Sequence, residues 1–178
     1  MTDLAEAVGP RDHSRGAEGA TTLLVYGDYE CPYTRAAYRS VEVLERRLDG
    51  AFRFVFRHFP LTEVHPHALA AAQAAETAAA LGSFWEMHEL LFEHQKALER
   101  EDLEGYASTL GLDLAAFRAG IDSSEYLPGI EHDVRTGIDS GVRGTPTIFL
   151  DGEVYDGSYM AAALQPEIER RLAAGRGA

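Results

Sequence analysis

The stretch TTLLVYGDYECPYT, residues 21–34, decides the fold. Its first half, residues 21–27, is a short and largely apolar run, which is typical of a buried strand. A polar turn follows at 28–30, and Cys31-Pro32 then predicts the start of a helix. Proline is favoured at the first helical position because the N–H group that it lacks would be unpaired there anyway. The stretch therefore predicts a strand that leads directly into a helix.

The residues after Pro32 extend this pattern. The predicted helix carries one apolar stripe, formed by Ala37, Val41, Leu44 and Leu48, and Asp49-Gly50 ends it. Residues 52–59, FRFVFRHF, alternate apolar and polar side chains at both ends and predict a second strand. Strand, helix and strand at this spacing predict a right-handed βαβ unit with parallel strands.

Helical signals then continue from residue 66 to about residue 141. They include a capping box at 83–86 and a final apolar stripe formed by Leu127, Ile130, Val134 and Ile138. Residues 147–155 predict a hairpin, because its central Asp151-Gly152 suits the positive φ angles of a two-residue turn. A last helix is expected from about 159 to 174, followed by a frayed tail at 175–178. The order predicts a mixed α/β sheet interrupted by helices.

Three regions follow from this order. Residues 1–20 are expected to be a lead-in, since 9–20 are polar and rich in glycine. Residues 21–65 and 142–174 form the predicted α/β domain, and residues 66–141 form an all-helical insertion within it.

Composition excludes several classes of protein. The chain has 178 residues, with 29 acidic and 16 basic side chains and a net charge of −13, so a nucleic-acid partner is not expected. The single cysteine, Cys31, excludes a disulfide-rich scaffold and a zinc site built from several cysteines. No apolar run reaches the roughly 20 residues of a membrane helix, and no secretory signal is visible, so a cytoplasmic protein with no membrane partner is expected.

Cys31 is the first candidate for chemistry. At a helix start, unpaired N–H groups and the helix dipole both stabilise a thiolate, the nucleophile of thiol–disulfide exchange. Asp28 and Glu30 oppose this effect by placing negative charge nearby. A buried and inert cysteine is the alternative, and position alone does not decide between the two.

The second candidate is Gly144-Thr145-Pro146-Thr147, directly before the hairpin. A proline that enters a strand cannot donate to the ladder and is unusual there. It fits either a cis peptide bond, which exposes the backbone of Thr145, or an ordinary trans proline at the start of an edge strand.

Together these motifs point to a family. Glu30-Cys31-Pro32-Tyr33-Thr34 resembles the Cys-Pro-Tyr-Cys active site of DsbA-like thioredoxin-fold oxidoreductases, and residues 144–147 resemble the cis-proline loop of that family. Residues 54–61, 65–68 and 84–88 are also similar to a branch of it. The resemblance covers about residues 12–173 and implies a thioredoxin fold, βαβ then ββα, with a helical insertion.

The resemblance also implies roles for individual residues. Cys31 is expected to be the nucleophile, and Thr34, which could donate a hydrogen bond to its thiolate, the second catalytic residue. Pro32, Tyr33, Thr145 and Pro146 are expected to contact the substrate, a protein or peptide thiol or disulfide, with the Thr145 backbone pairing with an extended peptide or a glutathione-like ligand.

Thr34 is the departure from the family. It stands where the family has its second cysteine, so no intramolecular disulfide can form, and the sequence leaves open whether Thr34 is native or an engineered replacement. A monothiol can still form a mixed disulfide that an external thiol releases. Glutathione or another low-molecular-weight thiol is therefore expected as co-substrate, and no bound cofactor is expected.

Three other functions stay open. One is a glutathione-dependent transferase or isomerase in which Thr34 or Tyr33 assists. Another is a peptide-binding, chaperone-like module without redox turnover, and the third is a disulfide-linked dimer through Cys31. The spacing of His58, His65 and His67 does not favour a metal site, so no metal is expected there, and His88 is expected to be a core or edge residue.

Overall fold

A five-stranded mixed sheet forms the centre of the computed structural model, which describes residues 3–175. Its strands lie in the order β1-β3-β2-β4-β5. Their bounds are β1 His13–Gly16, β2 Thr22–Gly27, β3 Arg53–His58, β4 Thr147–Leu150 and β5 Glu153–Tyr155. The β2–β3 pair is parallel and the other pairs are antiparallel, which confirms the predicted βαβ unit and the later hairpin.

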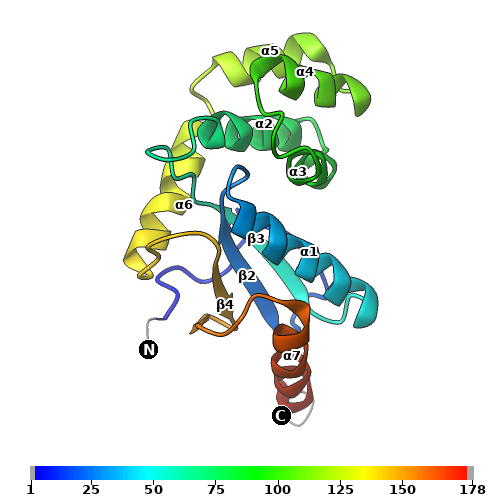
Figure 1. Ribbon diagram of the computed structural model, residues 1–178, viewed down its shortest axis with the longest axis vertical. Coiled ribbons are helices and arrows are strands. Elements are labelled where there is room, and N and C mark those ends of the chain that lie inside the picture. Colours follow the sequence, from blue (N-terminus) through cyan, green and yellow to red (C-terminus); the bar gives the residue numbers. More distant parts are fainter. Residues whose placement is uncertain (1–2, 176–178) are drawn as a thin grey trace.

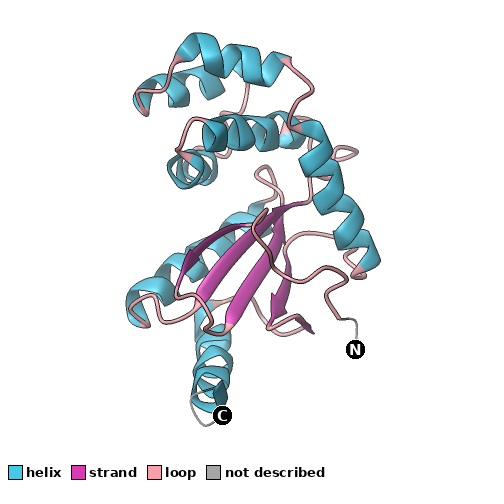
Figure 2. Ribbon diagram, turned by 180° about the vertical axis from the view of Figure 1, so that it is seen from behind, coloured by secondary structure: helices cyan, strands magenta, loops and turns pink. Residues whose placement is uncertain are grey.

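Seven helices accompany this sheet in the described residues. They are α1 Pro32–Arg47, α2 Ala68–Ala80, α3 Phe84–Glu93, α4 Arg100–Thr109, α5 Leu114–Asp122, α6 Leu127–Asp139 and α7 Ala161–Gly175. α1 and α7 cover one face of the sheet, and α2 to α5 stack beyond one end of it (Figure 1). Seen from behind, the other face is crossed by the N-terminal segment and flanked by α6 (Figure 2). None of the described helices is long and apolar enough to cross a membrane.

The segment expected to be a lead-in, residues 9–20, contains a strand that the sequence did not predict, His13–Gly16. These residues form the edge strand β1, antiparallel to β3, with His13 opposite Phe56 and Gly16 opposite Arg53. Their polar side chains concealed the strand, because three of them are bound by partners far away in sequence. Arg15, for example, donates to both carboxylate oxygens of Glu45 at 2.8 Å. The last three residues of the predicted frayed tail, 176–178, lie outside the described residues.

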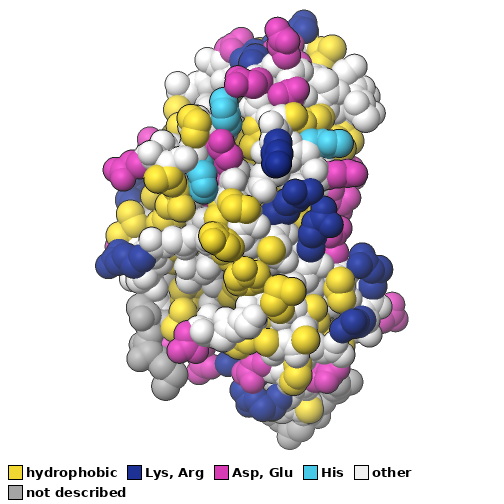
Figure 3. Space-filling view, viewed as in Figure 1, with side chains coloured by type: hydrophobic (Ala, Val, Ile, Leu, Met, Phe, Trp, Pro, Cys, Tyr) yellow, Lys and Arg dark blue, Asp and Glu magenta, His cyan; other side chains and the backbone are white. Residues whose placement is uncertain are grey.

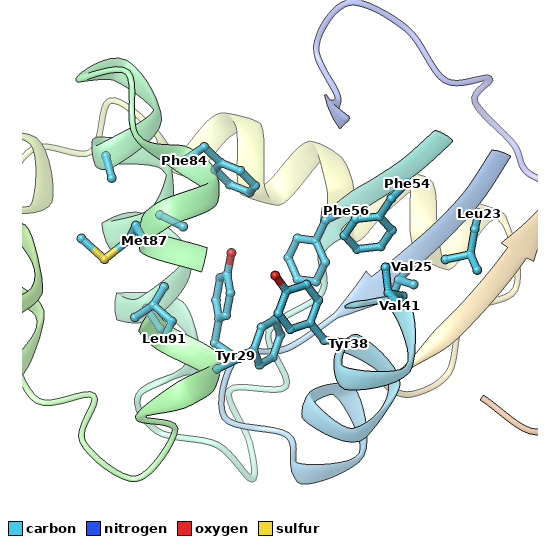
Figure 4. Close-up of a cluster of buried hydrophobic side chains, with 14 of the residues drawn as sticks. Leu23, Val25, Tyr29, Tyr38, Val41, Phe54, Phe56, Phe84, Met87 and Leu91 are labelled. Atoms are coloured by element: carbon cyan, nitrogen blue, oxygen red, sulfur yellow. The ribbon is translucent and has the colours of Figure 1, made fainter. Parts of the chain in front are cut away.

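The two faces of the sheet have separate cores, as the alternation along β2 requires. Leu23 and Val25 point into the larger core, under α1, α7 and the insertion, whereas Leu24 and Tyr26 point into a smaller core on the other face. An aromatic group that includes Tyr29, Tyr38 and Phe56 joins the sheet and α1 to α3 in the larger core (Figure 4). This aromatic contact fixes the insertion against the end of the sheet where β2 leads into α1.

Two details of the helices differ from expectation. Ser83 is the N-cap residue of α3, but its side chain makes no capping hydrogen bond, so the predicted capping box does not form. On α6, Ile130 is buried while Ile138 is 48 % exposed, because the buried face of the helix runs through Thr136 and Gly137 instead. The turn at Asp151-Gly152 is confirmed, with φ angles of 51° and 85°.

Candidate active site

Cys31 lies where the sequence places it, directly before α1. It is the N-cap residue, with extended backbone angles φ −75° and ψ 119°, and Pro32 occupies the first turn. Its own N–H donates to the carbonyl of Asp28 at 3.2 Å, which closes the turn between β2 and α1. The residue is only 3 % exposed, so the thiol lies in a recess. This position directs the positive end of the helix dipole toward the sulfur.

The loop before β4 supplies the other half of the site. The peptide bond between Thr145 and Pro146 is cis. The Cys31 thiol donates a hydrogen bond to the carbonyl oxygen of Thr145, with Sγ and O 3.3 Å apart. The hydroxyl of Thr145 is buried and has no hydrogen-bond partner among the described residues. Cys31 and the Thr145-Pro146 loop thus lie together, although 114 residues separate Cys31 from Thr145 in sequence.

Thr34 is close in the chain but bonds elsewhere. It is 1 % exposed, and its hydroxyl accepts a hydrogen bond from the backbone N–H of Asp28 at 3.4 Å. No hydrogen bond joins Thr34 to Cys31 in the part of the chain that is described. The predicted hydroxyl contact to the sulfur is therefore not present in this thiol form.

Pro32 and Tyr33 form the outer surface beside the thiol. Tyr33 is 62 % exposed, which makes it one of the most exposed large hydrophobic residues of the chain. On the face drawn in Figure 3, hydrophobic side chains gather over the middle of the molecule. A substrate that reaches Cys31 would therefore meet apolar surface around a recessed sulfur.

Asp28 organises the loop that carries the cysteine. Its carboxylate is fully buried and accepts three hydrogen bonds, from the N–H groups of Glu30 and Leu61 at 2.7 and 2.8 Å and from Nδ1 of His65 at 2.8 Å. Sequence reasoning treated Asp28 only as a negative charge near the thiol. The signal it missed was the position of a short acidic side chain at a strand-to-helix turn, where such residues bind backbone N–H groups.

Gln95 holds the same loop from the insertion. Its Nε2 donates to the carbonyls of Tyr29 and Cys31 at 2.7 and 2.8 Å. Beside it lies a groove of about 420 Å³ lined by Glu30, Pro32, His67, Gln95, Lys96, Leu98 and Glu99. No local sequence signal could have found this contact, because it spans 64 residues.

Tyr29 and His88 form a buried polar pair beneath the loop. The Tyr29 hydroxyl is hydrogen-bonded to Nδ1 of His88 at 2.8 Å, and both residues are almost fully buried. Burial raises the pKa of Tyr29 well above its ordinary value, and burial lowers the pKa of His88 well below its own. Both groups are therefore neutral near pH 7, and the expectation that His88 belongs to the core is confirmed.

The three histidines that were considered as metal ligands each have a different acidic partner. His65 binds Asp28, and His67 lies 3.6 Å from Glu99, whereas His58 turns to Glu76 at 2.7 Å. His13, from the unexpected strand, contacts the same oxygen of Glu76 as His58 does. The described residues that could hold a metal ion are thus His13, His58 and Glu76.

Comparison with known sequences gives one family. A family model described as Thioredoxin matches residues 9–170. The chain is 44 % identical over 178 residues to the Na(+)/H(+) antiporter NhaA 1 of Salinispora arenicola, covering 99 % of this chain and 27 % of that protein. It is 42 % identical over 159 residues to the Na(+)/H(+) antiporter NhaA of Herminiimonas arsenicoxydans, covering 89 % and 25 %. The chain therefore spans about a quarter of the length of these curated relatives.

Solved structures with the same fold are named for redox proteins. A thioredoxin-like oxidoreductase from Silicibacter pomeroyi is 25 % identical, with a TM-score of 0.80 over 91 % of this chain and 92 % of that one. BdbD from Bacillus subtilis, in its oxidised form, is 21 % identical, with a TM-score of 0.80 over 92 % and 94 %. The protein α-DsbA1 from Wolbachia pipientis is 18 % identical, with a TM-score of 0.79 over 98 % of each chain.

Proposed function

This chain belongs to the thioredoxin family and has a DsbA-like fold, and from that premise we propose that it exchanges thiols and disulfides through one nucleophilic cysteine, Cys31. One observation carries the proposal. The sulfur of Cys31 lies at the start of α1, 3.3 Å from the Thr145 carbonyl and beside cis Pro146, while Thr34 occupies the position of a resolving cysteine. The site has the parts of a redox active centre with one thiol instead of two.

The chemistry takes two balanced steps. The Cys31 thiolate attacks one sulfur of a substrate disulfide, forming a mixed disulfide and releasing the other sulfur as a thiolate. An external thiolate then attacks the substrate sulfur of the mixed disulfide, which regenerates the Cys31 thiolate and leaves a new disulfide between substrate and external thiol. No net oxidation occurs, so no further oxidant or reductant is required.

Thr145 positions the substrate in this scheme. Its carbonyl accepts from the Cys31 thiol at 3.3 Å, and that bond requires the sulfur-bound proton. Loss of the proton frees the carbonyl to accept an N–H group from an extended substrate backbone, as in pairing with an exposed strand edge. Activation of the sulfur and docking of the peptide are coupled through one oxygen.

The groove beside Cys31 supports a small thiol as co-substrate. It is lined by Lys96, which is the only lysine of the chain and offers positive charge to a carboxylate. Glu30 and Glu99 in the same lining suit an ammonium group. A thiol that carries both groups, such as glutathione, matches this mixed lining and the recessed sulfur.

Mass spectrometry after reaction with oxidised glutathione tests the proposal. The protein should gain one glutathionyl group on Cys31, and reduced glutathione should remove it. The Cys31→Ser variant is the control and should gain nothing. A wild-type protein that reacts no faster than a free cysteine peptide would contradict the proposal.

Binding measurements on the Cys31→Ser variant and a non-reducing gel separate the alternative functions. Tight glutathione binding that survives Cys31→Ser would instead indicate a glutathione-dependent transferase or isomerase. Peptide binding that is indifferent to this substitution would indicate a chaperone-like module. A band of doubled mass on a non-reducing gel would indicate a disulfide-linked dimer through Cys31.

A further inference from the structure

His13, His58 and Glu76 form a compact group away from the cysteine. They come from β1, β3 and α2, and one donor atom of each lies within 4.8 Å of those of the other two. Both imidazole Nε2 atoms lie 2.7 Å from the same carboxylate oxygen, Oε1 of Glu76. Two imidazoles and a carboxylate that converge on one point are a ligand set that proteins use for zinc and other divalent transition metals.

The group is partly buried and held in place. The side chain of His58 is 2 % exposed, and those of His13 and Glu76 are 23 % and 21 % exposed. The ring of His13 stacks on Phe84 of α3, with centroids 3.5 Å apart and planes within 8°. A ligand whose ring is fixed by packing loses little freedom when it binds a metal.

Charge favours a cation at this place. The carboxylate of Glu76 accepts from both imidazoles, so the two rings and the acidic side chain already meet at one oxygen. A second carboxylate, that of the half-buried Asp133, accepts the backbone N–H of His58 at 2.9 Å.

Space for an ion and its water adjoins the group. A cavity of about 220 Å³ is lined by Arg11, Asp12, His13, Phe56, Glu76, Gly129 and Asp133. Asp12 is engaged by the buried guanidinium of Arg57 at 2.6 Å, so it is not counted as a ligand. The second oxygen of Glu76 has no hydrogen bond among the described residues and remains available.

We propose that His13, His58 and Glu76 bind one divalent transition-metal ion, with Zn²⁺ as the best match to the two imidazoles and one carboxylate. Zinc bonds of about 2.0–2.2 Å would replace the two hydrogen bonds that now join the rings to Glu76. Asp133 or water from the adjoining cavity completes the coordination. The ion would tie edge strand β1 and insertion helix α2 to the end of β3.

Zinc titration of the Cys31→Ser protein tests this, because a cysteine thiolate binds zinc by itself. Calorimetry should show one equivalent bound, and zinc should raise the melting temperature. Glu76→Gln and His13→Gln should each weaken binding at least tenfold and reduce the thermal shift. His94→Gln is the matched control, since His94 is exposed and outside the group, and it should change neither.

The proposal is overturned if Cys31→Ser binds no zinc at micromolar concentration. It is equally overturned if His13→Gln binds zinc as tightly as its parent, or if His94→Gln weakens binding as much as His13→Gln does. Should Glu76→Gln fail to fold, His13→Gln decides alone, since His13 lies on an edge strand. The proposal does not depend on thiol chemistry, so a protein inactive in disulfide exchange can still bind zinc here.

Discussion

The sulfur of Cys31 and the carbonyl oxygen of Thr145 lie 3.3 Å apart, although 114 residues separate them in the chain. One belongs to the turn before α1 and the other to the loop before β4. The antiparallel β2–β4 pair brings these two loops to the same end of the sheet. The sheet therefore brings the two halves of the site together across the insertion that separates them in the sequence.

Thr34→Cys should restore a dithiol centre. Residue 34 lies one helical turn after Cys31 on the buried side of α1, where the resembling family has its second cysteine. Under mild oxidation both thiols of the variant should disappear as an intramolecular disulfide forms, whereas the wild-type protein keeps its thiol until an external disulfide is added. Thiol titration and mass spectrometry measure the change.

Thr34→Ser is the matched control for that variant. It keeps a hydroxyl that can accept from the N–H of Asp28 and adds no thiol. It should behave as the wild-type protein does in the titration. Free thiols that persist in oxidised Thr34→Cys would show that the two sulfurs cannot meet.

Gln95→Ala should loosen the cysteine loop. The substitution removes the donor shared by the carbonyls of Tyr29 and Cys31, and should lower the free energy of unfolding by about 1–3 kcal/mol. Alkylation of Cys31 by iodoacetamide should also become faster, which a purely global effect on stability would not require. Gln165→Ala removes only exposed hydrogen bonds and should leave both measurements unchanged.

Two helical glycines should respond in opposite directions to alanine. At Gly137 a Cβ atom would lie 2.8 Å from Cδ2 of Phe59 and 3.1 Å from Cε1 of Tyr26, so Gly137→Ala should cost about 1–3 kcal/mol. At Gly105 nothing lies within 4 Å, so Gly105→Ala should stabilise α4 by about 0.5–1 kcal/mol. Urea unfolding of both variants measures the change in the free energy of unfolding. Changes of the same sign in the two variants would contradict the packing described for α6.

Asp12→Asn should strongly destabilise the protein. Asp12 binds Nε of Arg57 at 2.6 Å, and these side chains are 8 % and 3 % exposed. Removing the carboxylate charge leaves the buried guanidinium without its counter-charge, which should lower the free energy of unfolding by about 3–5 kcal/mol. Asp122→Asn breaks a pair with Arg100 in which Asp122 is 66 % exposed, and should cost far less, because solvent screens an exposed pair. Chemical unfolding compares the two, and equal losses would refute the distinction.

His88 should make the protein less stable in mild acid. Its pKa is lowered by burial, so the unfolded chain takes up a proton near pH 6.5 that the folded chain refuses. The stability that the neutral, buried His88 contributes is complete above pH 6.5, and it is lost as the pH falls toward the pKa of His88 in the folded protein. His88→Phe should lack it, so the advantage of the wild-type protein over this variant should shrink from pH 7 toward pH 5. An advantage independent of pH would contradict a neutral buried His88.

Local patterns predicted the elements that carry the active centre. Pro32 marked the start of α1, and Asp151-Gly152 marked the hairpin, because each residue type is tied to a backbone geometry that needs no distant partner. The apolar run at 21–27 identified the central strand for the same reason. Cys31 and the Thr145-Pro146 loop could be paired only because their motifs resemble those of one family.

The remaining features depend on contacts between residues far apart in the chain, which local sequence patterns do not predict. His13 and Arg15 lie in a strand because residues of β3, α1 and α3 bind their backbone or side chains. The sequence around them shows no alternation of apolar and polar residues that would predict a strand. Gln95 reaches the cysteine loop because α3, which precedes it in the chain, packs on the aromatic group of the core. Ser83 lies at a helix start without capping it, which shows that residue type does not settle side-chain geometry.

Strand β1 also sets where the folding unit begins. A version of the protein that starts at residue 21 would retain every motif of the active centre, yet it would lose the partner of β3 and the carboxylate that neutralises Arg57. Such a truncation would leave a buried cation and an open sheet edge, two features that favour aggregation. A fusion that transplants this domain onto another protein therefore has to carry the polar segment before β2 with it.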